Sequence, residues 1–99
     1  MHVKIPCQRK VIEFFGEEAQ AIVQCEECAE LIQSISKLQR AKNMGLNEKP
    51  AIEHLTEEMA DVLVCMGQMQ ELYGISDDAL QEMVNRKTAR QEARISGYA

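Results

Sequence analysis

Apolar and polar positions follow one another along this chain with the period of an α-helix. Apolar residues recur three and four positions apart over long stretches, which is the spacing of one helix face. Nothing in the chain reads as a strand, where apolar and polar residues would alternate strictly. The pattern predicts a short helix over residues 8–15 and three long helices over residues 17–41, 51–73 and 77–95. The last of these is expected to carry Leu80, Met83 and Val84 on its inner face.

Glycine, proline and small polar residues mark the predicted ends of these helices. Gly16 closes the short helix, and Gly74 is expected to end the third as a C-terminal cap. Ser76 is expected to cap the start of the last helix with its hydroxyl oxygen. Residues 42–50 contain asparagine, glycine and proline and are predicted to form a loop, and we expect residues 96–99 to fray.

These elements predict an all-α fold in a single domain covering residues 1–99. The expected architecture is an antiparallel helical bundle of three long helices and one short N-terminal helix. A domain of this size buries only about 60 to 70% of the surface that its unfolded chain exposes. The core must be built from Leu, Ile, Val and Met, because the chain has no Trp and 4% aromatic residues. We therefore expect the bundle to be completed by self-association.

The charge balance and the cysteines narrow the class of protein. The 11 basic and 16 acidic residues give a net charge of −5, which argues against general binding of nucleic-acid phosphates. Four cysteines without a secretory signal peptide predict a reduced, cytoplasmic setting. No stretch approaches the roughly 20 apolar residues that cross a membrane. We therefore expect a soluble protein whose partners include neither nucleic acid nor membrane.

Two acidic pairs lie where the helical pattern places the apolar face. Glu27 and Glu30 form one pair, and Glu58 and Asp61 form the other. At about 100° per residue, each pair projects into the apolar stripe of its own helix. These stripes contain Val23, Leu31 and Leu38 on one helix and Leu55, Val62, Cys65, Met69 and Leu72 on the other. Removing an ionised carboxylate from water costs several kcal/mol, so acids in this position need a partner.

A divalent cation between two neighbouring helices is the partner that we predict. Residues three apart differ by about 4.5 Å in helical rise, so both carboxylates of a pair can share one cation. Mg²⁺ takes oxygen ligands and usually binds through carboxylates together with substrate phosphates. The pattern thus predicts a Mg²⁺ site, able to take Mn²⁺ as well, in a protein that acts on phosphates. Its predicted ligands are Glu27, Glu30, Glu58 and Asp61.

Three ordered motifs resemble a known family. The segment EECAEL at residues 26–31 and the segment EMADVL at residues 58–63 resemble the ExxE and ExxD signature of the MazG-like all-α nucleoside triphosphate pyrophosphohydrolases. The segment NRKTAR at residues 85–90 resembles the NxKxxR segment of that group. The resemblance spans roughly residues 19–94. It implies a homodimer or homotetramer that hydrolyses a nucleoside triphosphate to the monophosphate and pyrophosphate.

Residue roles follow from this resemblance as expectations. One of the catalytic carboxylates, Glu27 or Glu30, would orient or deprotonate the attacking water. Asn85, Lys87 and Arg90 would bind the phosphates of the substrate. The alternative is a helical interaction module without catalytic activity, whose acids pair with Lys or Arg across a subunit interface. Metal binding distinguishes the two, because only the enzyme requires it.

Other residues with chemical potential have simpler interpretations. Cys25 and Cys28 lie inside a continuous helical pattern with no second pair, so we predict core packing rather than a zinc site, and the same packing role for Cys65. His54 lies one turn before Glu58. It is predicted to cap the start of its helix or lie exposed there, and the alternative is that it supports the neighbouring acid or acts as a general base.

Overall fold

The computed structural model, which describes residues 1–98, consists of helices joined by short connections. The helices are α1 (Arg9–Phe15), α2 (Glu17–Asn43), α3 (Lys49–Tyr73) and α4 (Asp77–Tyr98). No strand occurs within residues 1–98, so the predicted all-α class is confirmed. No helix in this part of the chain has the length and apolar character that crossing a membrane requires.

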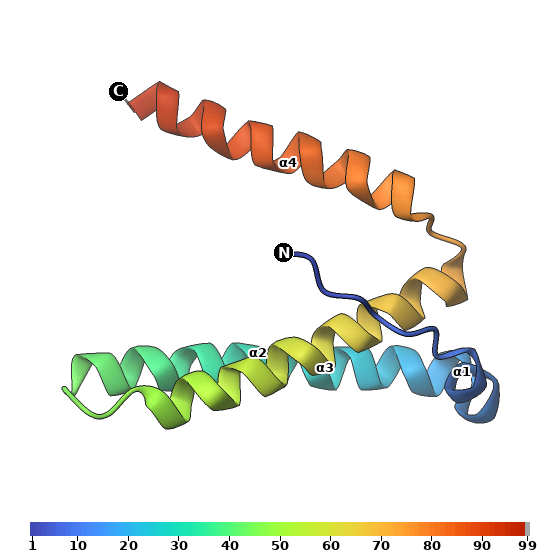
Figure 1. Ribbon diagram of the computed structural model, residues 1–99, viewed down its shortest axis with the longest axis horizontal. Coiled ribbons are helices and arrows are strands. Elements are labelled where there is room, and N and C mark those ends of the chain that lie inside the picture. Colours follow the sequence, from blue (N-terminus) through green and yellow to red (C-terminus); the bar gives the residue numbers. More distant parts are fainter. Residues whose placement is uncertain (99) are drawn as a thin grey trace.

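The helices α2 and α3 pack against each other as an antiparallel hairpin, which is the structural centre of the molecule (Figure 1). Residues 44–48 reverse the chain between them, and Gly45 there adopts a positive φ of 66°. The short helix α1 contacts both long helices at the end of the hairpin where α2 begins. This arrangement brings the middle of α2 beside the middle of α3.

The helix ends agree with the predicted signals to within a few residues. Gly74 adopts the left-handed conformation at φ 63° and its N–H donates to the Gln70 carbonyl, which confirms the predicted cap. Ser76 also caps as predicted, since its Oγ accepts a hydrogen bond from the Ala79 N–H at 3.0 Å. The predicted loop over 42–50 is too long at both ends. The helix α2 continues to Asn43, and α3 begins at Lys49, because proline is tolerated in the first turn of a helix. Ala99 lies outside the described residues, and α4 extends past its predicted end at residue 95.

The core of the hairpin is small, as expected of a chain of this length. Its buried apolar side chains are Leu38, Val62 and Cys65. Four polar residues are buried among them, namely Gln20, Ser34, Glu58 and Gln68. Gln20 Nε2 donates to Gln68 Oε1 at 2.7 Å, so this polar pair is satisfied across the two helices. The seam between α2 and α3 is therefore unusually polar for a helix pair.

The last helix, α4, does not join the hairpin. Within residues 1–98 it packs against none of the other helices, and it leads away from the end of α3 (Figure 1). Its apolar residues Leu80, Met83 and Val84 were predicted to face inward, but they are 37, 46 and 46% exposed. Within one chain, the predicted bundle of three long helices is therefore reduced to α2 and α3.

The N-terminal segment, residues 1–8, runs back from α1 across α3 on the side that faces α4 (Figure 1). Ile5 fits against Gly67, where a methyl group added to the glycine would lie only 3.0 Å from Ile5 Cγ2. Arg9 ties the start of α1 to the same helix through an ion pair of 2.9 Å with Glu71. The N-terminal segment therefore packs closely on α3 at Gly67, where the absence of a side chain leaves room for Ile5.

Candidate metal centre

The four predicted ligands come together in the middle of the hairpin. Glu27 and Glu30 extend from α2, and Glu58 and Asp61 extend from α3. Each contributes one carboxylate oxygen to a group whose atoms all lie within 4.8 Å of one another. The antiparallel packing produces this cluster, because both acidic pairs lie near the midpoint of their helices. We call these four residues the carboxylate cluster.

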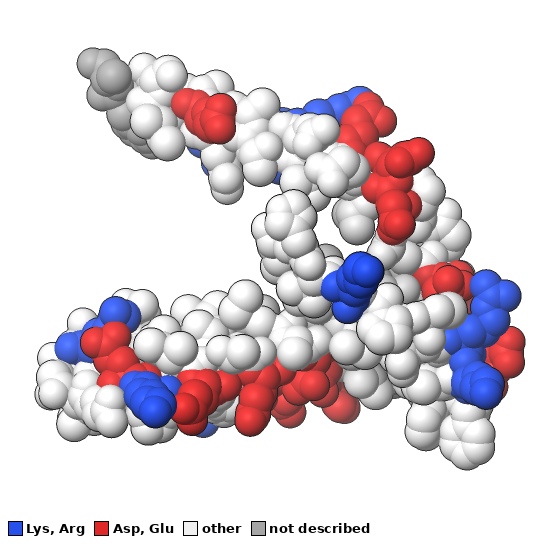
Figure 2. All heavy atoms as spheres, in the orientation of Figure 1, with Lys and Arg blue, Asp and Glu red and all other residues white. Residues whose placement is uncertain are grey.

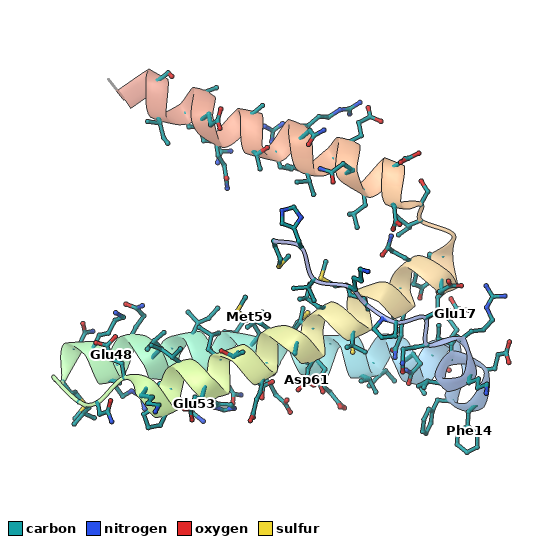
Figure 3. The ribbon with its side chains drawn as sticks, in the orientation of Figure 1. Phe14, Glu17, Glu48, Glu53, Met59 and Asp61 are labelled. Carbon is teal, nitrogen blue, oxygen red and sulfur yellow. The ribbon has the colours of Figure 1, made fainter. Side chains whose placement is uncertain are left out.

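The cluster lies on the side of the hairpin that faces away from α4. Figure 2 shows acidic side chains gathered along this edge of α2 and α3. In Figure 3, Asp61 points to this edge, whereas Met59 points to the opposite edge, toward α4. The acidic side chains of the hairpin therefore gather on one edge, and Met59 lies on the other (Figure 2 and Figure 3).

Burial divides the cluster into an inner and an outer half. Glu58 is only 8% exposed, and Glu27 is partly buried. Glu30 and Asp61 are exposed at the rim. The prediction that the acids interrupt the apolar stripes is thus confirmed for the inner two, while the outer two lie at the edge of the stripe. A group held here would contact protein on one side and solvent on the other.

The inner carboxylates have oxygen atoms without hydrogen-bond partners. Both Glu27 Oε2 and Glu58 Oε2 are buried and accept no hydrogen bond from residues 1–98. The other oxygen of Glu58 lies 3.1 Å from His54 Nε2. A buried acceptor without a partner costs free energy, more so when it is charged. These two atoms are therefore the strongest sign that the cluster could hold a metal ion.

The electrostatics of the cluster disfavour its fully ionised form. Burial raises the pKa of Glu27, and the nearby charges of Asp61 and Glu30 raise it further. Burial also raises the pKa of Glu58, with a further rise from Glu30 and a partial opposing effect from His54. A bound cation would reverse both effects, since it stabilises the ionised form of every carboxylate that it touches.

The cysteines play no part in this cluster. Cys25 is exposed, so its predicted packing in the core is wrong for the single chain, because the residue projects from the outer side of α2. Cys28 is partly buried and Cys65 is buried, as expected of packing residues. Burial raises the pKa of the Cys65 thiol, with smaller contributions from Glu27 and Asp61, so the thiol stays protonated at neutral pH.

The predicted phosphate-binding residues lie elsewhere. Asn85, Lys87 and Arg90 are exposed on α4, which does not contact the hairpin, so one chain does not bring them to the carboxylates. Asn85 Oδ1 accepts a hydrogen bond from Gln81 Nε2 at 3.0 Å. Their role in binding phosphate stays a prediction.

Sequence reasoning missed the polar residues that continue the seam beyond the cluster. Gln20 and Gln68 pair there, and Gln24 has a buried Oε1 without a hydrogen-bond partner. A signal for Gln20 was present, because it lies two helical turns before Glu27 in the same stripe. Gln20 and Glu27 are thus both polar residues that interrupt the apolar stripe of the same helix.

Comparison with known proteins adds nothing to this geometry, since no family model, no curated protein and no solved structure matches the chain.

Proposed function

We propose that the carboxylate cluster binds Mg²⁺ and that the protein is a nucleoside triphosphate pyrophosphohydrolase. The observation that supports this most is Glu58 Oε2, an acceptor on a residue that is 8% exposed, which has no partner among residues 1–98. Glu27 Oε2, on the facing helix, is also a buried acceptor without a partner among these residues. Burying two such oxygens among like charges is unfavourable when both are ionised, and either a bound cation or a retained proton relieves it; we propose the cation.

The ligand set favours Mg²⁺ or Mn²⁺ over softer metals. All four side chains offer oxygen, and no histidine or cysteine belongs to the group within residues 1–98. The exposed rim formed by Glu30 and Asp61 leaves space for water and phosphate oxygens to complete the coordination. A site of this kind is suited to a substrate that carries several phosphates.

The reaction follows from the residues and from the family that the motifs resemble. A bound divalent cation would neutralise the triphosphate and lower the pKa of a coordinated water. Glu30 is exposed at the rim, so its carboxylate is available to orient that water or accept its proton. Glu27 is the second candidate for this role. The inner carboxylate of Glu58 serves to hold the cation.

We further propose that the active form is a homodimer or homotetramer. The side of the hairpin opposite the acids exposes apolar side chains at helical spacing on both long helices. These side chains are Ile32, Ile35, Ile52, Met59 and Met66. An exposed apolar face of this kind is typical of an interaction surface. A second copy would also supply an α4 whose Asn85, Lys87 and Arg90 contact substrate phosphates.

The proposal is tested by supplying substrates. The purified protein is incubated with a panel of canonical and modified nucleoside and deoxynucleoside triphosphates with Mg²⁺, and pyrophosphate and monophosphate are measured. We expect both products from at least a subset of the panel and neither when EDTA is present. Release of inorganic phosphate with the diphosphate, or no reaction across the panel, would contradict the proposed activity.

A second candidate function is a helical interaction module without catalytic activity. It is favoured by one observation, the exposed α4 with Lys87, Arg90 and Arg94, which could neutralise the carboxylates of a second copy without metal. The two candidates differ in their response to cations. Mg²⁺ should raise the thermal midpoint of the enzyme by binding its folded state, whereas the interaction module would not respond.

A further inference from the structure

The Glu58 carboxylate has two oxygens in different environments. Oε1 lies 3.1 Å from His54 Nε2, whereas Oε2 is buried without a hydrogen-bond partner. His54 lies one turn earlier on α3, and residues four apart on a helix face the same side. The helix spacing therefore places the imidazole within reach of this carboxylate.

From this asymmetry we infer that His54 is a positioning residue, which holds Glu58 Oε1 so that Oε2 is directed at the cation. This inference rests on the proposed metal site. A neutral imidazole with its proton on Nε2 donates to Oε1 and restricts rotation of the carboxylate group. One oxygen is then occupied by the hydrogen bond, and the other remains available as a single ligand. Partners of this kind orient metal ligands in many proteins.

Glu58 is the carboxylate for which such support has the largest effect. It is the most buried of the four, so water has the least access to set its orientation. Glu30 and Asp61 are exposed and can be solvated instead. Within residues 1–98, His54 is also the side chain that offers a hydrogen bond to an acid of the cluster. The histidine side chain is 43% exposed, so replacing it leaves the thin core intact.

The test compares two substitutions that differ in the donor. His54→Gln keeps an N–H group that can reach Glu58, whereas His54→Phe keeps a ring of similar size without a donor. His2→Phe is the matched control, because His2 is exposed in the N-terminal segment. Dissociation constants for Mg²⁺ and Mn²⁺ are measured by calorimetric titration of the metal-free full-length proteins, and their thermal midpoints are recorded.

We expect His54→Phe to weaken cation binding by roughly tenfold or more, the usual effect of losing a residue that orients a metal ligand. His54→Gln and His2→Phe should bind close to wild type, and the metal-free thermal midpoints should agree. If the wild-type protein binds neither cation, the metal site and this inference both fail. If the wild type binds but His54→Phe binds equally well, or His54→Gln is as weak as His54→Phe, the metal site stands and the positioning role is overturned.

Discussion

The seam between α2 and α3 and the isolated helix α4 show what an amphipathic pattern does and does not determine. Both have apolar residues at helical spacing, yet only the seam buries them. Every residue of α4 from 77 to 97 is exposed. The seam also buries Glu58, a costly residue, whereas α4 exposes Leu80 and Met83, which would be stabilised by burial. The chain thus contains a carboxylate cluster that could hold a metal ion and an exposed apolar face on α4.

The two regions also separate opposite charges. The carboxylate cluster has no Lys or Arg partner within residues 1–98. Lys87, Arg90 and Arg94 lie exposed on α4. If a cation neutralises the cluster, these basic side chains remain free to bind the substrate. If they neutralise the cluster themselves in a second copy, no cation is needed.

The largest effect is expected from neutralising the inner acid of the seam. Glu58→Gln removes a buried charged ligand, so we expect at least about a hundredfold loss of pyrophosphate release and no rise in thermal midpoint on adding Mg²⁺. The metal-free variant should unfold at a higher temperature than wild type, because a source of repulsion is gone. Glu57→Gln is the control, since Glu57 is exposed beside it. Turnover of Glu58→Gln near the wild-type rate would show that Glu58 is not part of the site.

The next effect concerns α4. Met83→Glu places a charge on its apolar stripe, and we expect the association constant of the oligomer to fall by roughly tenfold or more, as burial of one such side chain implies. Light scattering after size-exclusion chromatography measures the change. Ala89→Glu adds the same charge on the far side of α4, because Ala89 follows Leu80 by nine residues, about two and a half helical turns, and it should leave association intact. An oligomer unaffected by Met83→Glu would exclude this stripe from the interface.

A smaller effect is expected from pH. The pKa values of Glu27 and Glu58 are raised in the folded state, so the folded protein binds more protons than the unfolded one between the ordinary and the raised pKa. Their contribution to stability is present below the ordinary pKa and is lost as pH rises through the raised pKa. We expect the metal-free wild type to lose more stability than Glu58→Gln on going from about pH 4 to pH 8, measured by urea unfolding at each pH. If the free energy of unfolding changed equally with pH in the two proteins, the raised pKa of Glu58 would be contradicted.

The smallest effect is expected where the N-terminal segment meets α3. A methyl group in Gly67→Ala would press on Ile5, while alanine favours the helix by about 1 kcal/mol. These effects oppose each other, so global stability should change little, but cleavage by trypsin after Lys4 should accelerate. Gly97→Ala is the control, because open space surrounds Gly97 on α4. Unchanged cleavage after Lys4 would show that this contact does not hold the segment.

Sequence predicts the helices better than their packing. Gly74 and Ser76 fix helix ends through local conformation and hydrogen bonds, so their roles are visible from neighbouring residues alone. The stripe on α4 does not say what covers it, because an apolar face fits a helix of its own chain or of another. The pattern therefore predicts that Leu80, Met83 and Val84 face inward, where the single chain leaves them exposed.

The site is predictable for a similar reason and to a similar extent. The spacing of each acidic pair, together with a loop that pairs α2 with α3, was enough to bring the four carboxylates together. Which of them is buried depends on how far each lies around its helix from the line of contact. That angle separates buried Glu58 from exposed Asp61, although both belong to one motif. The unpartnered oxygens follow from side-chain rotamers, which the sequence pattern does not specify.

The most direct measurement is anomalous diffraction from crystals of the protein grown or soaked with Mn²⁺. If the carboxylate cluster is a metal centre, we expect a manganese peak between α2 and α3, within bonding distance of oxygens from Glu27, Glu30, Glu58 and Asp61. A cluster with no peak, whose carboxylates instead pair with Lys87, Arg90 or Arg94 of a second copy, would contradict it.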